Sequence, residues 1–224
     1  MNLSNFDQRV VFDNARAALV KAFGDDPSVL NTAILTQSYL RFEQPLVVNQ
    51  TQYTFNVLDQ GSANTTNTEK RLRLQDSFVI SNILICTGAP SSATDNTFLP
   101  DTYSNTQKYT AAGAQAALQA FWNAGNFSIS VNNNVIVPSW DIFRHYNANQ
   151  TQQTAALGAA SPQDQSAGAL DGWYPCEPNI SLIGQKNNVL SINLLGAGLA
   201  AIQTNSRAII ILRGVLAQNV TVVS

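Results

Sequence analysis

The stretch 127–137 constrains the fold more than any other part of the chain. It reads Phe-Ser-Ile-Ser-Val-Asn-Asn-Asn-Val-Ile-Val. Apolar residues alternate with serine, stop at the three asparagines, and resume the apolar face at Val135 and Val137. Alternation with a period of two is typical of a half-buried strand, and asparagine tolerates the positive φ that a tight turn needs. The stretch therefore predicts a β-hairpin, and with it a sandwich or barrel of antiparallel strands.

Further segments of alternating or β-branched residues are spread along the chain. We expect strands at 39–42 with 46–48, 53–57, 71–74, 78–86, 139–143, 180–182, 189–194, 208–215 and 220–223. The segments 180–182 and 189–194 flank another Asn-Asn corner, which predicts a second hairpin. The total of about 8–10 strands fits a mainly β fold, an antiparallel jelly-roll-like β-sandwich. An immunoglobulin-like sandwich is the alternative, although that fold usually needs only about 100 residues.

The N-terminal part of the chain is predicted to be helical. Apolar residues recur at three- and four-residue spacing over 5–23, and Gly24 supplies a stop. Residues 28–35 predict a second, short helix. We therefore expect a helical N-terminal arm, 1–38, followed by one β-sandwich domain, 39–224. The arm either packs on its own sheet or reaches a neighbouring subunit, and the sequence leaves both alternatives open.

Two long segments interrupt the strands. Residues 88–112 are rich in Pro, Ser, Thr, Asp and Asn, and residues 147–170 are rich in Gln, Ala and Ser. Loops longer than about 12–15 residues are uncommon and are usually functional or disordered. We expect both segments to leave the sheet and to carry contacts between subunits. An Ala-rich stretch at 111–121 predicts a short helix before the central hairpin.

The composition of the chain indicates which kinds of molecule it could bind. Charged residues make up only 12% of the chain, against about 25% in a typical domain, while Asn and Gln together number about 40. A net charge of −2 leaves no basic surface for a phosphate backbone, so we expect no direct nucleic-acid binding. Copies of a weakly charged protein repel one another little. This favours a subunit of an assembly, and a secreted or salt-adapted monomer with a polar coat is the alternative.

The sequence predicts neither a targeting or transmembrane segment nor a metal site, and it leaves a disulfide undecided. The first residues are polar, so we expect no signal peptide. The longest apolar run is far shorter than the ~20 residues that cross a bilayer, so no transmembrane segment is expected. Cys86 lies in an apolar run and Cys176 lies between two prolines. The sequence does not decide whether they pair, and two cysteines without matching histidines do not predict a metal site.

The sequence predicts no catalytic, cofactor-binding or metal-binding residues. His145 is the single histidine, and no nucleophile, second histidine or patterned carboxylate accompanies it, although a hydrolase that uses it as a base remains an alternative. The remaining candidates are aromatic residues that could contact a ligand or a partner. They are Trp122, Trp140, Trp173 and Tyr174. Such side chains either form a stacking platform for a sugar or fill a core or an interface.

Four stretches carry a resemblance to a known group of proteins. They are Tyr-Leu-Arg-Phe-Glu-Gln-Pro at 39–45, Gln-Tyr-Thr-Phe at 52–55, Asn-Ile-Ser-Leu at 179–182 and Arg-Ala-Ile-Ile-Ile-Leu-Arg-Gly-Val-Leu at 207–216. With the helical N-terminal segment, they resemble bacteriophage virion structural proteins, in particular jelly-roll capsid or capsid-associated proteins.

The resemblance implies a non-enzymatic structural subunit that acts through self-assembly as a homo-oligomer. Its partners would be copies of itself and other virion proteins, and it would be made in the host cytoplasm and end in the virion. The alternative is a carbohydrate- or receptor-binding β-sandwich module of a fibre or surface protein. In that case the tryptophans would line a groove that binds a glycan.

Overall fold

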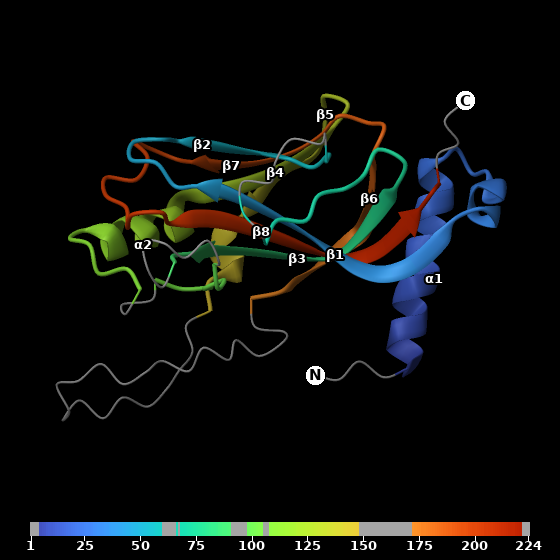
Figure 1. Cartoon of the computed structure of the whole chain (residues 1–224), viewed down its shortest axis with the longest axis horizontal. Helices are drawn as coiled ribbons and strands as arrows, with labels where there is room; N and C mark the ends of the chain where they lie inside the picture. Colours follow the sequence, from blue (N-terminus) through green and yellow to red (C-terminus); the bar gives the residue numbers. More distant parts are fainter. Residues whose placement is uncertain are drawn as a thin grey trace.

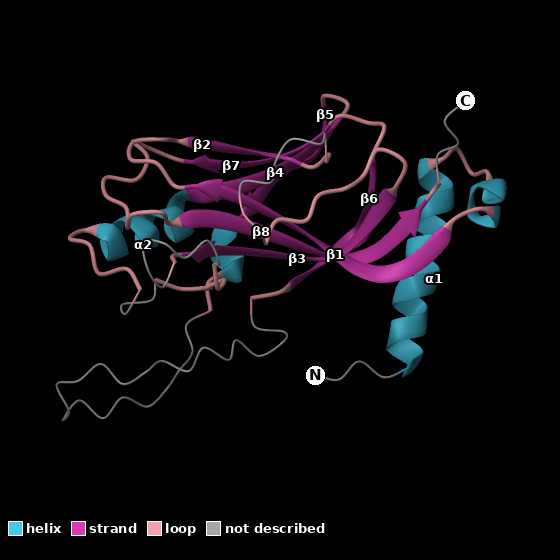
Figure 2. Ribbon diagram, in the orientation of Figure 1, coloured by secondary structure: helices cyan, strands magenta, loops and turns pink. Residues whose placement is uncertain are grey.

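The computed structural model describes residues 5–59, 66, 68–90, 98–104, 108–147 and 172–220. This part of the chain is mainly β, with two antiparallel four-stranded sheets and two α-helices (Figure 1; Figure 2). The two sheets face each other in a sandwich-like arrangement, with α1 at one end and α2 at the other. The prediction of a mainly β fold is thus confirmed.

Consecutive strands lie in opposite sheets, except for the fourth and the fifth, which are paired in the same sheet. The elements are α1 (Asn5–Ala22), the 3₁₀ helix η1 (Pro27–Asn31), β1 (Ile34–Pro45), β2 (Gln52–Asn56), β3 (Ser77–Gly88), α2 (Ala114–Ala124), β4 (Gly125–Val131), β5 (Asn134–Asp141), the 3₁₀ helix η2 (Ile142–His145), β6 (Tyr174–Ile183), β7 (Asn188–Leu194) and β8 (Arg207–Gln218). One sheet has the order β1-β8-β3-β6, and the other has the order β2-β7-β4-β5.

The predicted central hairpin is present as β4 and β5. Val131 pairs with Asn134, and the two turn residues between them, Asn132 and Asn133, have φ of 49° and 65°. Positive φ at both central positions is the requirement of a type I′ turn, which asparagine meets. The predicted apolar face does not extend to Val135, which is 60% exposed. The reason is that the pairing of β5 with β4 shifts register twice, so the alternation of side chains across the sheet is broken.

The second predicted hairpin, around the Asn-Asn corner at 187–188, is wrong. β6 belongs to the first sheet and β7 to the second, so the turn between them crosses from one sheet to the other. Gly184 allows this corner, because a Cβ there would lie 2.2 Å from the carbonyl oxygen of Arg73. A hairpin turn and a crossing corner use the same turn residues, so the local sequence does not distinguish them.

Other predicted boundaries also need correction. Residues 71–74 contain only an isolated bridge at Leu72 instead of a strand. The predicted strand 139–143 ends at Asp141, and η2 begins at the next residue, Ile142. The predicted second helix is shorter, and its last residues, 34–35, already belong to β1. These segments have apolar spacing that suits two kinds of structure, and tertiary contacts select between them.

The main core lies between the two sheets. Side chains alternate between buried and partly exposed along β7, and the large buried residues Phe42, Phe55, Phe127 and Ile210 come from both sheets. This arrangement is the inward-facing pattern expected of stacked sheets. Val220, where a last strand was predicted, lies outside the strands, and 221–223 lie outside the described residues.

A second, smaller core holds α1 on the outer face of the first sheet. Ala15 and Leu19 pack with Val79, Val215 and Ala217. The Ser181 hydroxyl also donates a hydrogen bond to the carbonyl of Ala18, at 3.3 Å. Of the two alternatives for the N-terminal arm, the described helix takes the first, since it packs on its own sheet.

The described part of the segment 88–112 packs on the sheet, which corrects the expectation that it leaves the sheet. Asp101 forms an isolated antiparallel bridge with Thr87, and Phe98 and Tyr109 are buried. Residues 91–97 and 105–107 lie outside the described residues, as does nearly all of 147–170. The helix predicted at 111–121 is confirmed as α2, a few residues further on.

Candidate functional site: an aromatic cluster around a buried histidine

Two of the predicted aromatic residues, Trp140 and Tyr174, meet where β5, η2 and β6 adjoin. Trp140 lies near the end of β5, and Tyr174 is the first residue of β6. Their ring centroids are 6.2 Å apart and the ring planes are nearly perpendicular, at 89°. His145, the last residue of η2, contacts both rings. We refer to Trp140, Arg144, His145 and Tyr174 as the His145 cluster.

The cluster is assembled by one turn of 3₁₀ helix. The Asp141 carboxylate accepts a hydrogen bond from the backbone N–H of Phe143 at 2.9 Å, which caps η2 where β5 ends. Capping satisfies a donor that the start of a helix leaves open. Because the chain then turns back instead of continuing as a strand, His145 lies beside Trp140.

Both ring nitrogens of His145 are engaged inside the protein. Nε2 accepts a hydrogen bond from the indole N–H of Trp140 at 2.9 Å, and Nδ1 lies 2.8 Å from the carbonyl oxygen of Gly172. A carbonyl only accepts, so these neighbours assign the proton to Nδ1 of a neutral ring. The side chain is fully buried. In this arrangement neither nitrogen is left to act as a base or as a metal ligand.

The surroundings keep His145 neutral. Burial lowers the pKa of its imidazole to about 4, and the positive charge of Arg144 acts in the same direction. The carbonyl of Gly172 opposes this effect, because it accepts a hydrogen bond from the ring. A neutral imidazole suits the indole donor, which would meet a second N–H if the ring were protonated.

The outward side of the cluster carries a cation among aromatic rings. The guanidinium carbon of Arg144 lies 5.3 Å from the ring centroid of Trp140 and 6.0 Å from that of Tyr174. Beside it, Phe143 is 53% exposed and stacks on Tyr146 with an interplanar angle of 7°. Arginine and aromatic residues are enriched in protein interfaces. Phe143 and Arg144 were not among the site residues predicted from the sequence, where their only signal is that they follow Trp140 closely.

The other two predicted aromatic residues lie apart from this cluster. Trp122, on α2, is fully buried in the core, where it makes edge contacts with Phe121 and Tyr146. Trp173 is partly buried, and the guanidinium of Arg213 lies over its ring at 4.0 Å. The ring of Trp140 is likewise in contact with His145 and Arg144. The three tryptophans therefore do not form one continuous stacking surface.

A second group of buried polar side chains lies on the first sheet. The carboxylate of Glu43, fully buried, pairs with Nε of Arg41 at 2.7 Å and accepts hydrogen bonds from the hydroxyls of Thr66 and Thr68. The backbone N–H of Glu43 donates to the carboxylate of Glu69 at 3.1 Å. We refer to Arg41, Glu43, Thr66 and Thr68 as the Glu43 network. It fastens the segment before β3 to the edge of β1.

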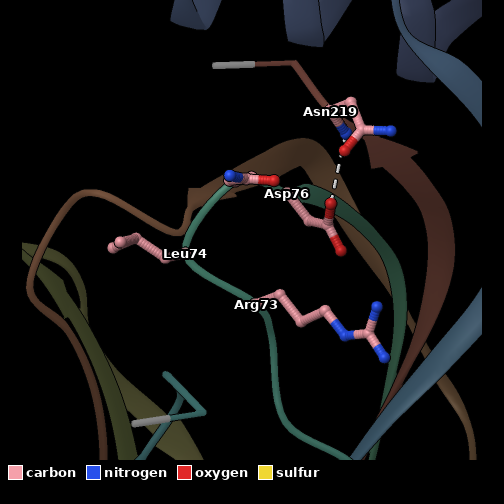
Figure 3. A pocket seen from close by; sticks show the side chains of 5 residues that line it. Arg73, Leu74, Asp76 and Asn219 are labelled. Atoms are coloured by element: carbon pink, nitrogen blue, oxygen red, sulfur yellow. Dashed lines mark hydrogen bonds between the residues drawn. The ribbon is translucent and has the colours of Figure 1, made fainter. Parts of the chain in front are cut away.

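A surface depression lies where the start of β3 meets the end of β8 (Figure 3). Arg73, Leu74, Gln75, Asp76 and Asn219 line it, and its volume is about 240 Å³. This is smaller than the roughly 300–1,000 Å³ of typical small-molecule sites. The Asp76 carboxylate accepts a hydrogen bond from the backbone N–H of Asn219 at 3.2 Å, so the polar groups here join two strand ends.

Among the described residues, the cysteines and the acidic side chains form neither a disulfide nor a metal site. Cys86 and Cys176 are both buried and unpaired, which answers the open question of a disulfide. Burial raises the pKa of both thiols, that of Cys176 to about 11. Within the described ranges, no group of three or more His, Cys, Asp or Glu side chains is placed to hold a metal ion.

Comparison with known proteins gave no matching family model and no matching curated protein. In the part of the chain that the structure describes, no helix combines the length and apolar character needed to cross a membrane.

Proposed function

We propose that this protein is a structural subunit of a virus particle, a phage capsid or capsid-associated protein that acts through self-assembly. The observation that carries the proposal is the strand order, β1-β8-β3-β6 in one sheet and β2-β7-β4-β5 in the other. Most consecutive strands lie in opposite sheets, and the first and last strands are neighbours. This order supports an eight-stranded double Greek key, the jelly roll, which is used by many capsid and lectin domains.

The surface supports the same proposal. Large apolar side chains are exposed at Leu99, Val135, Ile136, Phe143 and Leu195, with Leu195 74% exposed. Only 12% of the residues of the whole chain are charged. Apolar surface without strong like-charge repulsion favours burial against another protein. A subunit whose partners are copies of itself and other virion proteins would place such side chains in contacts.

The first test is the solution mass of the purified protein, measured by light scattering over a wide range of concentration. We expect a closed oligomer or larger particles, and electron microscopy of the large species should show a regular outline. A strict monomer at every concentration would contradict a self-assembling subunit.

A second candidate is a module that binds a glycan or a receptor. The His145 cluster favours it, because Arg144 and the partly exposed Tyr174 together offer a cation and an aromatic ring. Reproducible binding on a glycan array should be lost in Tyr174→Ala if this cluster is the site. Trp173→Ala is the matched variant, since Trp173 is covered by Arg213. Loss of binding in Trp173→Ala alone would place the site elsewhere, and no binding by the wild-type protein would exclude glycans on the array as ligands.

A further inference from the structure

The four outer edges of the two sheets differ in how they are protected. A sheet edge presents unpaired N–H and C=O groups, and proteins commonly protect it with bulges, prolines, charges or short strands. On β6 the register shifts by several residues opposite Ile80 and Asn82, where Glu177 and Pro178 lie. On β5 the register shifts twice, and Pro138 lies within the strand. The fourth edge strand, β2, has only 5 residues.

The edge of β1 has no bulge and no proline over its first half, although the Lys70 ammonium reaches its end, where it donates to the Ser38 hydroxyl at 3.0 Å and lies 4.6 Å from the ring centroid of Tyr39. The strand is 12 residues long, and its register with β8 is unbroken from Ile34 to Pro45. Residues 34–40 read Ile-Leu-Thr-Gln-Ser-Tyr-Leu, without a charge or a proline. Ile34 is 57% exposed and Tyr39 is 47% exposed. Figure 1 shows this half of β1 at the same end of the molecule as α1.

The backbone groups that face outward can be identified from one bridge. Arg41 exchanges two backbone hydrogen bonds with Lys70, of 2.9 and 2.8 Å, on the side of β1 away from β8. Antiparallel pairing alternates the direction of these groups with every residue. Leu35, Gln37 and Tyr39 therefore also direct their N–H and C=O groups outward. Among the described residues, no backbone hydrogen bond outside the β1–β8 ladder involves these three.

The open stretch is complementary to itself. If two copies pair antiparallel about a two-fold axis at Gln37, each Leu35 lies opposite Tyr39 of the partner subunit, and the two Gln37 side chains lie opposite each other. On the other face Thr36 lies opposite Ser38 of the partner subunit. Apolar–aromatic pairs and pairs of hydroxyl side chains stabilise neighbouring strands. The backbone of Lys70 already occupies the edge at Arg41, so the pairing would end there, and the Lys70 side chain would move aside from Ser38 and Tyr39.

We propose that residues 34–40 of β1 pair with the same residues of a second copy, which joins the two first sheets into one continuous sheet across a two-fold axis. About six backbone hydrogen bonds would form, from the outward groups of three residues on each copy. This inference rests on the proposed self-association and names the surface that carries it. Isologous contacts of this kind are the commonest in homo-oligomers.

The first experiment compares Gln37→Lys with Thr54→Lys by light scattering over a range of concentration. Both side chains are exposed on edge strands, but only Gln37 lies on the proposed axis. Two lysines opposite each other would repel, so we expect Gln37→Lys to raise the dissociation constant of the pair by at least about tenfold. Thr54→Lys should behave as the wild-type protein. Circular dichroism checks that each variant is folded.

The second experiment compares Gln37→Cys with Thr54→Cys under mild oxidation. Directly opposite residues that exchange hydrogen bonds have Cα atoms about 5.5 Å apart, within the range of a disulfide. We expect a covalent dimer of Gln37→Cys on a non-reducing gel and none of Thr54→Cys. The native cysteines are buried, so they should not contribute to the cross-link.

The outcomes separate this inference from the proposed function. Large wild-type assemblies that persist unchanged in Gln37→Lys, with no Gln37→Cys cross-link, would overturn the β1 pairing and leave the structural-subunit proposal standing. A Gln37→Cys dimer without any larger species would support the pairing and count against a particle subunit. A monomeric wild-type protein with no cross-link would overturn both.

Discussion

Glu43 and His145 are both completely buried, and the protein accommodates them in opposite ways. Glu43 is surrounded by groups that favour a charge, since Arg41 forms an ion pair with it and two threonine hydroxyls donate to it. His145 is kept neutral mainly by burial and by the charge of Arg144, while the Trp140 indole N–H donates to one ring nitrogen and the Gly172 carbonyl accepts from the other. The protein thus pairs the carboxylate of Glu43 with a buried cation and keeps the imidazole of His145 uncharged.

The groups that surround Glu43 and those that surround His145 come from different parts of the chain. The Glu43 network draws on β1 and on the distant segment that contains Thr66 and Thr68, so it holds together parts of the chain that are far apart in sequence. The His145 cluster is built mainly from neighbouring residues of β5 and η2, with Tyr174 added from the start of β6, and the carbonyl of Gly172 just before β6 binds the histidine ring. Removing one interacting group should therefore change the stability of the protein by different amounts in the Glu43 network and in the His145 cluster.

The largest effect is expected for Glu43→Gln, which keeps the size of the side chain and removes its charge. Arg41, whose side chain is only 12% exposed, would then be left without its carboxylate partner. Removing one member of a buried ion pair typically costs about 3–5 kcal/mol. Urea unfolding should show a loss of stability in this range. A loss under about 1 kcal/mol would mean that the network does not hold a charge.

A somewhat smaller effect is expected from pH. The pKa of His145 is near 6.5 in the unfolded chain and about 4 in the folded protein, so between these values the unfolded state binds the extra proton. The free energy of unfolding should therefore be unaffected by the protonation of His145 above pH 6.5. It should decrease as the pH falls from 6.5 toward 4, by up to about 3 kcal/mol.

The measurement for this prediction is unfolding at several pH values for the wild-type protein and for His145→Asn. Carboxylates also titrate near the lower end of the window, and they are common to both proteins. Since His145 is the single histidine of the chain, the difference between the two pH slopes isolates its contribution. Parallel slopes would show that the buried ring is not held neutral.

A loss of about 1–2 kcal/mol is expected for Trp140→Phe. The variant retains an aromatic ring but removes the indole N–H, which leaves Nε2 of His145 without its donor. The histidine pKa should rise at the same time, because the donor favours the neutral ring. Proton resonances of the histidine ring followed through a pH titration would check this. An unchanged pKa would indicate that burial alone keeps the ring neutral.

The smallest effect is expected for Asp13→Asn, the exposed counterpart of Glu43→Gln. Asp13 lies 3.9 Å from Arg9 on α1, and the two side chains are 60% and 83% exposed. Exposed pairs of this kind contribute about 0.2–1 kcal/mol at most. The free energy of unfolding, measured in urea, should change by less than about 0.5 kcal/mol. An effect as large as that of Glu43→Gln would show that burial does not set the difference between the two pairs.

Part of the fold and little of the site could be predicted from the sequence. The alternation around the asparagines at 132–133 predicted a hairpin correctly, because the turn residues and the strands that they join are adjacent. The corner before β7 was predicted wrongly with the same signal, because the choice between pairing and crossing is made by β3 and β2. Trp140 and Tyr174 were selected as aromatic residues, but nothing in their spacing placed them together.

The sequence by itself determined the mainly β class, the helix α1, the central turn and the weak charge of the chain, since these depend on local periodicity and composition. The tertiary structure decided which strands share a sheet, which edge stays open, and which buried polar group keeps its charge. These features depend on contacts between residues far apart in the chain, such as Glu43 with Thr66 and His145 with Gly172. A local pattern specifies the conformation of a segment, whereas the partner of a buried group is fixed only when the segments pack together.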